Sequence, residues 1–176
     1  MGLKGVFLDR DGVINRAMIR NGKPYPPSSL SELKFLPAVL QSLQTLSEAG
    51  YCLIGVTNQP DVARGVQKRE TVERINLAIL SKLPIKEIFT CYHDNKDDCP
   101  CRKPKPGLIL QDAEKYKIDL SQSWMVGDRW KDIAAGKSAG LRTIFVNNNY
   151  KEAYLGPLAD FIIQNTAELS RIILIA

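Results

Sequence analysis

Residues 5–12 read GVFLDRDG, an apolar run followed directly by two aspartates. The run lacks polar alternation, which predicts a strand buried on both faces over residues 4–8. Asp9 and Asp11 then stand at the carboxyl end of this strand, and Gly12 permits a turn that lets both carboxylates point into one pocket. Functional sites of parallel sheets lie beyond such strand ends.

Short β-rich runs alternate with longer helical patterns along the rest of the chain. Further strands are predicted over residues 51–56, 87–92, 124–126, 142–146 and 160–163, and helices over residues 37–49, 68–83, 106–116, 132–139 and 166–173. This alternation predicts an α/β fold, an open doubly wound parallel sheet with helices on both faces. One domain without a cap is expected over residues 1–176. Residues 14–33 contain three prolines and are predicted to be irregular, with enough length for a flap over the site.

The composition is that of a globular protein, with 44% of the 176 residues hydrophobic and 24% charged. The net charge of +5 is scattered apart from residues 102–105. We therefore expect a small anionic substrate and no nucleic acid, because nucleic-acid binders more often carry a continuous basic stripe. No stretch reaches the ~18 apolar residues of a membrane span, and the N-terminal run is too short for a signal peptide. A cytoplasmic location and no membrane partner are expected, and the chain is expected to act as a monomer.

Asp9 and Asp11 could together catalyse phosphoryl transfer if both side chains reach one pocket. One carboxylate can attack phosphorus and form an aspartyl-phosphate, while the other protonates the leaving oxygen and later deprotonates water. Two adjacent acids repel each other and an anionic substrate, so a divalent cation is expected, and hard oxygen ligands favour Mg²⁺. Taken alone, the same pair is also compatible with a polar loop or a helix cap.

Two further polar segments are candidates for phosphate binding. Thr57, Asn58 and Gln59 follow the second strand and offer a hydroxyl, amides and backbone N–H groups, although such residues are also ordinary in turns. Arg102 and Lys103 precede the third helix. Cations at a helix N-terminus oppose its dipole, so these two are better explained as phosphate ligands than as a basic loop.

The strand predicted over residues 124–126 is followed by two more aspartates. Asp128 is predicted to be a magnesium ligand, because it stands at a strand end like Asp9. Asp132 has two open interpretations, an acid that supports the site from behind or the N-cap of the next helix.

Soft metal ligands are concentrated in residues 91–101. Cys91, His93, Cys99 and Cys101 have the spacing C-x-H, five residues, then C-x-C. Three thiolates and one imidazole complete a tetrahedral Zn²⁺ site with no open position, as in structural sites. Disulfides are the alternative, but they are rare in the cytoplasm and would leave the histidine unexplained. The zinc-binding loop would hold the segment that ends at residues 102–103.

The order of these motifs along nearly the whole chain resembles the haloacid dehalogenase-like hydrolase superfamily. The resemblance implies that Asp9 is the nucleophile and Asp11 the general acid and base. It also implies that Thr57 and Lys103 bind phosphate. Asp128 would hold Mg²⁺ together with Asp9 and the backbone carbonyl of Asp11.

The zinc loop and the missing cap resemble one small branch of this superfamily, which contains D-glycero-D-manno-heptose 1,7-bisphosphate phosphatases and histidinol-phosphate phosphatases. The stretches that resemble the heptose enzymes are residues 7–15, 56–59, 63–65 and 102–107. The branch implies substrate contacts for Arg102 and Arg129 and a sugar bisphosphate as the substrate. Pro60-Asp61 stands where the heptose enzymes usually have Ser-Gly, and the five-residue zinc spacer is nearer to the histidinol-phosphate enzymes. Histidinol-phosphate hydrolysis therefore stays open, as does a non-catalytic zinc-binding interaction module.

Overall fold

The computed structural model describes residues 2–176 and is built on a six-stranded sheet. The strands are β1 (Gly5–Leu8), β4 (Cys52–Asn58), β5 (Glu87–Cys91), β6 (Trp124–Gly127), β7 (Arg142–Val146) and β8 (Phe161–Ile163). They are all parallel and lie in the order β5-β4-β1-β6-β7-β8. The predicted open parallel sheet is therefore confirmed, and within residues 2–176 no separate cap domain is inserted.

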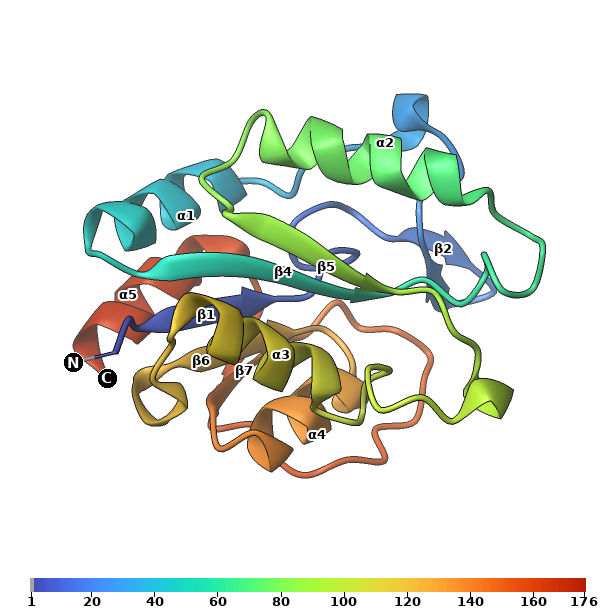
Figure 1. The fold of residues 1–176 in the computed structure, drawn as a ribbon. Helices are drawn as coiled ribbons and strands as arrows, with labels where there is room; N and C mark the ends of the chain where they lie inside the picture. Colours follow the sequence, from blue (N-terminus) through green and yellow to red (C-terminus); the bar gives the residue numbers. More distant parts are fainter. Residues whose placement is uncertain (1) are drawn as a thin grey trace.

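Helices cover both faces of the sheet (Figure 1). The helices are α1 (Val39–Glu48), α2 (Arg69–Leu80), α3 (Gly107–Tyr116), α4 (Trp130–Ser138) and α5 (Leu169–Ile175). Val6 and Leu8 of β1 pack in one core with residues of α1, α2 and α5, while Phe7 packs in a second core with α3 and α4. Successive side chains of a strand point to opposite faces, which is why one apolar run serves two cores.

The direction in which successive strands are added to the sheet reverses at β1. The chain runs outward from β1 to β4 and β5, then returns through α3 to β6 on the other side of β1. In open parallel sheets the crevice at such a switch point, beyond the carboxyl ends of the strands, is where ligands bind. Asp9 follows β1 at this point, and its backbone N–H donates to the carbonyl of Val126 in β6 at 2.9 Å.

The prediction that residues 14–33 are irregular is wrong in part. Strands β2 (Met18–Arg20) and β3 (Lys23–Tyr25) form an antiparallel hairpin, and a 3-10 helix, η1, covers Leu30–Glu32. The hairpin turns at Asn21 and Gly22, with φ angles of 53° and 77°. This is the backbone that two-residue hairpins require, and the Asn-Gly pair is its strongest sequence signal.

The other predicted elements differ from the structure only near their ends. The predicted helix over residues 132–139 begins two residues earlier, at Trp130 in α4, and the last one divides into η4 (Thr166–Glu168) and α5. Two more 3-10 helices, η2 (Asn95–Asp97) and η3 (Leu120–Gln122), lie in loops. Within residues 2–176, no helix has the length and apolar character needed to cross a membrane.

Candidate active site

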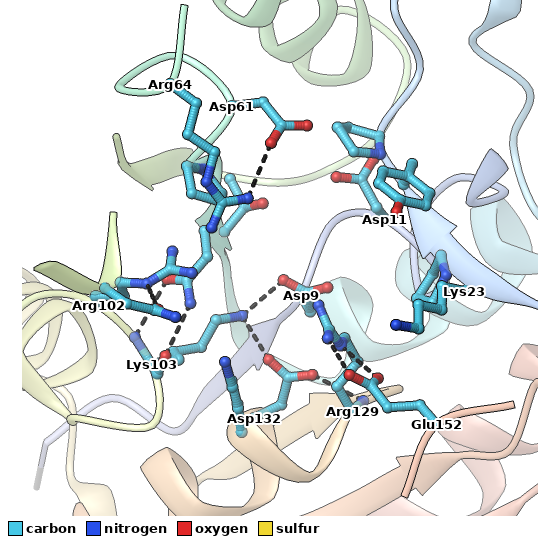
Figure 2. A pocket seen from close by; sticks show the side chains of 18 residues that line it. Asp9, Asp11, Lys23, Asp61, Arg64, Arg102, Lys103, Arg129, Asp132 and Glu152 are labelled. Atoms are coloured by element: carbon cyan, nitrogen blue, oxygen red, sulfur yellow. Dashed lines mark hydrogen bonds and ion pairs between the residues drawn. The ribbon is translucent and has the colours of Figure 1, made fainter. Parts of the chain in front are cut away.

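A buried lysine joins two of the acids at the carboxyl ends of the strands. Lys103 Nζ lies 2.6 Å from Asp9 Oδ1, 2.6 Å from Asp132 Oδ1 and 2.7 Å from the carbonyl oxygen of Val56 in β4 (Figure 2). Lys103 is only 2% exposed, and Asp132 only 3%. An ammonium group so deeply buried requires this set of acceptors, because a buried charge without partners is very costly.

The burial of this cluster changes its protonation equilibria. Burial, together with the nearby carboxylates of Asp132 and Asp11, raises the pKa of Asp9 to about 7 in spite of the opposing effect of Lys103. Burial alone would lower the pKa of Lys103, but the carboxylates of Asp132 and Asp9 outweigh it and the pKa is raised. Lys103 is therefore a permanent cation beside Asp9.

Asp128 has the features expected of a ligand for a hard cation. Its Oδ1 atom is buried and has no hydrogen-bond partner in the part of the chain that the structure describes. One carboxylate oxygen from each of Asp9, Asp128 and Asp132 lies within 4.8 Å of the others. Burial and the charges of Asp9 and Asp132 raise the pKa of Asp128 well above its ordinary value. A divalent cation would relieve this repulsion and use the free oxygen, so the donor set fits Mg²⁺.

The Asp128 carboxylate lies against the turn after β1. A Cβ placed on Gly12 would be 1.8 Å from Asp128 Oδ2, and Gly12 has a φ of +92°. Both the close approach and the positive φ require glycine at this position. The turn predicted from the sequence is therefore confirmed, and it brings the loop after β1 against the loop after β6.

Asp11 is held firmly behind the cavity mouth. Its carboxylate accepts from Arg10 Nη2 at 2.9 Å, from Asn15 Nδ2 at 2.9 Å and from Gln59 Nε2 at 2.8 Å. The Arg10 side chain is completely buried and also donates to Asn76 Oδ1 at 3.0 Å. These donors fix the Asp11 carboxylate, which lines the same cavity as Asp9.

The three residues predicted after β4 have different positions. Thr57 lines the cavity, and its hydroxyl accepts from Gln59 Nε2 at 2.9 Å. Gln59 itself is only 1% exposed and connects Thr57 to Asp11 from behind. The Asn58 side chain donates to the carbonyl of Lys103 at 2.9 Å and accepts from its N–H at 3.2 Å. Asn58 thus fixes the backbone that carries the lysine, a role that its position in the sequence did not reveal.

A cavity of about 250 Å³ opens above these residues and has a charged mouth. Its lining includes the predicted Arg102 and Arg129, and also Lys23, Arg64 and Lys131, which the sequence analysis did not select. The other lining residues are Asp9, Asp11, Pro24, Tyr25, Pro26, Thr57, Asn58, Pro60, Asp61, Asn95, Lys103, Asp132 and Glu152. Lys23 reaches the cavity because the hairpin β2–β3 carries it there (Figure 2).

Most acids at the cavity mouth are already paired with arginines. Arg64 binds Asp94 with Nη2···Oδ1 at 2.5 Å and Asp61 with Nη1···Oδ1 at 3.2 Å. Arg129 Nε donates to Glu152 Oε2 at 2.9 Å. By contrast, within residues 2–176 no carboxylate forms an ion pair with Lys23, Lys131 or Arg102. The mouth therefore has cations available to an anionic ligand.

The predicted cysteine–histidine cluster is brought together at the end of β5. Cys99 Sγ and Cys101 Sγ are 3.1 Å apart, Cys91 Sγ lies 3.3 Å from Cys101 Sγ, and His93 Nδ1 lies 3.3 Å from Cys101 Sγ. Tetrahedral thiolates around a zinc ion would be about 3.8 Å apart. No disulfide joins the cysteines that the structure describes, and the four side chains are grouped so that they can hold a metal ion.

The cluster and the cavity share one loop. Arg102 follows Cys101, and its guanidinium donates to the carbonyl of His93 at 3.2 Å and to Asn95 Oδ1 at 2.9 Å. Lys103 comes next and reaches Asp9. The segment that holds the four soft ligands therefore also sets the position of two cavity cations.

Three comparisons with known proteins, by family model, by sequence and by structure, agree on one family. A family model described as HAD-hydrolase-like matches residues 100–169. The D-glycero-beta-D-manno-heptose-1,7-bisphosphate 7-phosphatase of Haemophilus influenzae is 33% identical over 97% of this chain and 96% of its own length. The Helicobacter pylori phosphatase of the same name is 36% identical over 79% of this chain and 80% of its own. The crystal structure of D,D-heptose 1.7-bisphosphate phosphatase from B. bronchiseptica, in complex with magnesium and phosphate, aligns with a TM-score of 0.82 and 30% identity, covering 98% of both chains. The chain belongs to the haloacid dehalogenase-like hydrolases.

As a haloacid dehalogenase-like phosphatase, the chain is an enzyme, and the alternative of a non-catalytic zinc-binding module is wrong. The N-cap alternative for Asp132 is also wrong. Arg129 is the N-cap of α4, and Asp132, at the third helical position, accepts from the Arg129 N–H at 3.0 Å. One carboxylate oxygen of Asp132 thus accepts from the backbone at the N-terminus of α4, and the other binds Lys103.

Proposed function

We propose that this phosphatase hydrolyses a phosphate monoester through an aspartyl-phosphate on Asp9, with Asp11 as general acid and base. The observation that carries the proposal is the 2.6 Å contact between Lys103 Nζ and Asp9 Oδ1 on the cavity wall. This contact provides a carboxylate nucleophile with a permanent positive charge beside it. Such a pair suits attack on phosphorus, where negative charge must be balanced as the phosphoryl group moves.

The reaction proceeds in two displacements. An oxygen of Asp9 attacks phosphorus, the bond from phosphorus to the leaving oxygen breaks, and the Asp11 carboxyl donates its proton to that oxygen. The Asp11 carboxylate then takes a proton from water, which attacks the same phosphorus and releases inorganic phosphate and free Asp9. Lys103 and the Thr57 hydroxyl hold the phosphoryl oxygens, and Lys103 offsets their charge.

The acids of the site also support a metal requirement. Asp9, Asp128 and the backbone carbonyl of Asp11 would hold Mg²⁺, with Asp132 supporting the site through Lys103. When bound, the ion supplies positive charge that allows an anionic phosphate to approach two carboxylates.

We also propose Zn²⁺ as the occupant of the cysteine–histidine cluster. Cys91, His93, Cys99 and Cys101 provide four ligands and leave no open coordination position, which is the pattern of a structural site. The ion would fix the loop that carries Arg102 and Lys103, so its effect on catalysis would be indirect.

A sugar bisphosphate, D-glycero-D-manno-heptose 1,7-bisphosphate, is the proposed substrate, cleaved at its 7-phosphate. The relatives that share most of this chain carry that name. The mouth of the cavity supports the assignment, because Arg102, Lys23 and Lys131 are available to a second phosphate beyond the one at Asp9. Arg129, which is paired with Glu152, is a further candidate for this contact.

Histidinol phosphate is less well matched to the same mouth. Its cationic amine would need an acidic wall, which Asp61 of the cavity lining and Asp94, the other acid bound to Arg64, could form. Both carboxylates bind Arg64, at 3.2 and 2.5 Å, so neither presents a free negative charge. A cationic amine would have to displace the arginine first.

The test is phosphate release from the heptose 1,7-bisphosphate and from histidinol phosphate, with Mg²⁺ present and Asp9→Asn as the blank. We expect kcat/KM to be at least about 10²-fold higher for the bisphosphate, since two cations contacting a second phosphate contribute about 3 kcal/mol. A higher kcat/KM for histidinol phosphate would overturn the substrate assignment but not the chemistry. A wild-type rate in Asp9→Asn would overturn the nucleophile.

A further inference from the structure

Tyr150 makes a direct contact with the most buried acid of the site. Its hydroxyl lies 2.6 Å from Asp128 Oδ2. Neither the strand-end acids nor the basic segments predicted from the sequence include this tyrosine, which lies in the loop after β7. The same hydroxyl lies 3.0 Å from Asn148 Nδ2, which also donates to the carbonyl of Gly12 at 2.9 Å.

The direction of the hydrogen bonds follows from the atoms involved. The Asn148 amide nitrogen can only donate, so the Tyr150 oxygen accepts from it. The tyrosine proton is then directed to Asp128 Oδ2, which accepts it. Asp128 is ionised when it binds a cation, and in that state both of its oxygens are acceptors.

This arrangement gives the two oxygens of Asp128 different roles. Oδ2 accepts from Tyr150, lies 3.4 Å from Asn148 Nδ2 and lies against Gly12, while Oδ1 is buried without a hydrogen-bond partner among residues 2–176. A carboxylate with one oxygen anchored cannot rotate freely, so its other oxygen stays directed to one place. We infer that Tyr150 is a positioning residue, which fixes the Asp128 carboxylate so that Oδ1 is the oxygen that meets Mg²⁺.

The loop that carries Tyr150 is itself anchored on both sides. Asn148 binds the turn after β1 through the carbonyl of Gly12, and the N–H of Lys151 donates to the carbonyl of Gly22 at 2.8 Å. Gly22 is at the tip of the hairpin β2–β3, whose Lys23 lines the cavity. The anchors keep Tyr150 in place without help from any ligand, as expected of a group that orients a metal ligand in advance.

The inference rests on the proposed Mg²⁺ site, and its test is Mg²⁺ binding to the full-length protein without substrate. Calorimetry and the rise of the thermal midpoint with Mg²⁺ concentration measure the affinity of Tyr150→Phe. We expect its dissociation constant to rise about tenfold, because loss of a partner of a metal ligand typically costs 10–100-fold. Its kcat at saturating Mg²⁺ should stay within about threefold of wild type, since no reacting atom is touched.

Tyr154→Phe is the matched control, because it removes a hydroxyl of the same segment whose partner within residues 2–176 is the carbonyl of Pro157, at 2.7 Å. Its Mg²⁺ affinity should equal that of wild type. If Tyr150→Phe does not fold, Asn148→Ala decides, because it removes the amide that binds the Tyr150 hydroxyl and lies 3.4 Å from Asp128 Oδ2. It should also weaken Mg²⁺ binding, and a dissociation constant within twofold of wild type would overturn the anchoring of Asp128.

Asp128→Asn separates this inference from the metal site itself. If Asp128→Asn loses Mg²⁺ binding while the dissociation constant of Tyr150→Phe stays within twofold of wild type, the role of Tyr150 is overturned and the site stands. If Asp128→Asn binds Mg²⁺ like wild type, the proposed site is wrong, and the role of Tyr150 fails with it.

Discussion

The acidic centre and the cysteine–histidine cluster are neighbouring sites built in opposite ways. In the acidic centre, Asp9 and Lys103 are 94 residues apart in the chain. They are in contact only because the end of β1 and the loop before α3 meet at the carboxyl ends of the parallel strands. All four ligands of the cluster come from residues 91–101, within one loop and the strand end before it. The centre depends on the whole fold, whereas the cluster depends on local chain geometry and on the metal ion proposed for it.

The two sites also differ in how they balance charge. Lys103 is enclosed by Asp9 and Asp132, so the centre carries part of its own counter-charge. Among residues 2–176 no buried cation lies beside the cysteines of the cluster as Lys103 lies beside Asp9, so the proposed metal ion would supply the counter-charge of their thiolates. Removing a charged side chain should therefore have its greatest effect in the centre, whereas the loop of the cluster should respond mainly to the loss of its own metal ion.

The largest expected effect is that of Asp9→Asn on turnover. The amide keeps the shape of the side chain but cannot attack phosphorus, so kcat should fall by more than about 10⁴-fold. The thermal midpoint should not fall, because Lys103 retains Asp132 and one buried acid with a raised pKa has been removed. The matched control is Asp98→Asn in the exposed loop, which should keep the wild-type rate. A rate above one-hundredth of wild type in Asp9→Asn would contradict the assigned nucleophile.

Lys103→Met should affect both turnover and stability. Loss of the cation leaves Asp9 and Asp132 without their shared counter-charge, and breaking a buried pair in this way costs about 3–5 kcal/mol. We expect this loss in chemical denaturation at pH 8 without metal, and a fall in kcat of about 10²–10³-fold. The free-energy loss should shrink as the pH falls, because Asp9, whose pKa rises further once the opposing Lys103 is removed, then takes up a proton. Lys105→Met, two residues along and exposed, should change neither quantity by more than about twofold in rate or 0.5 kcal/mol.

The structure brings together acids that the sequence placed at strand ends, while their catalytic roles stay a prediction. Asp9, Asp11 and Asp128 could be selected because buried parallel strands place their carboxyl ends together. Asn58 and Gln59 have different positions from those expected, because their side chains turn back to the Lys103 backbone and to Asp11. No local pattern distinguishes an amide that binds a ligand from one that binds a neighbouring loop.

The parts that the sequence did not predict depend on contacts between distant loops. Lys23 lines the cavity because of a hairpin whose Asn21-Gly22 signal was available but not used. Tyr150 and Glu152 meet Asp128 and Arg129 across loops that follow different strands, and no spacing rule predicts such pairs. The cluster in residues 91–101 is the opposite case, since spacing alone predicted that its four side chains would come together.

Loss of the metal from the cluster should have a smaller effect than either change in the centre. Cys99→Ser should release the proposed zinc ion and lower kcat/KM by about tenfold with Mg²⁺ present, because the loop that carries Arg102 and Lys103 is then no longer fixed. Zinc content by elemental analysis, the thermal midpoint and phosphate release measure the three effects. Cys52→Ser removes a thiol of β4 that is outside the cluster, and it should keep its zinc. Full activity and an unchanged midpoint in zinc-free, magnesium-replete protein would show that the loop holds its shape without the ion.

The smallest expected effect concerns a buried acid outside both sites. Asp112 in α3 is completely buried, and neither of its carboxylate oxygens has a hydrogen-bond partner in the described part of the chain. Burial, with a contribution from Glu87 in β5, raises its pKa to about 8 against the opposing effect of Lys115. Unlike Asp9, it has no buried lysine, so it tests what an acid costs when no cation accompanies it.

The sign of the pH dependence follows from this raised pKa. Between about pH 4 and pH 8 the folded state holds a proton on Asp112 that the unfolded state has lost, so stability falls as the pH rises through this range. Asp112→Asn removes this dependence and should raise the thermal midpoint by about 3 °C at pH 9, roughly 1 kcal/mol, and by less at pH 5. Glu114→Gln, on the exposed side of the same helix, should leave the midpoint unchanged at both values. A gain for Asp112→Asn that is equal at pH 5 and pH 9 would mean that packing, and not the buried charge, is responsible.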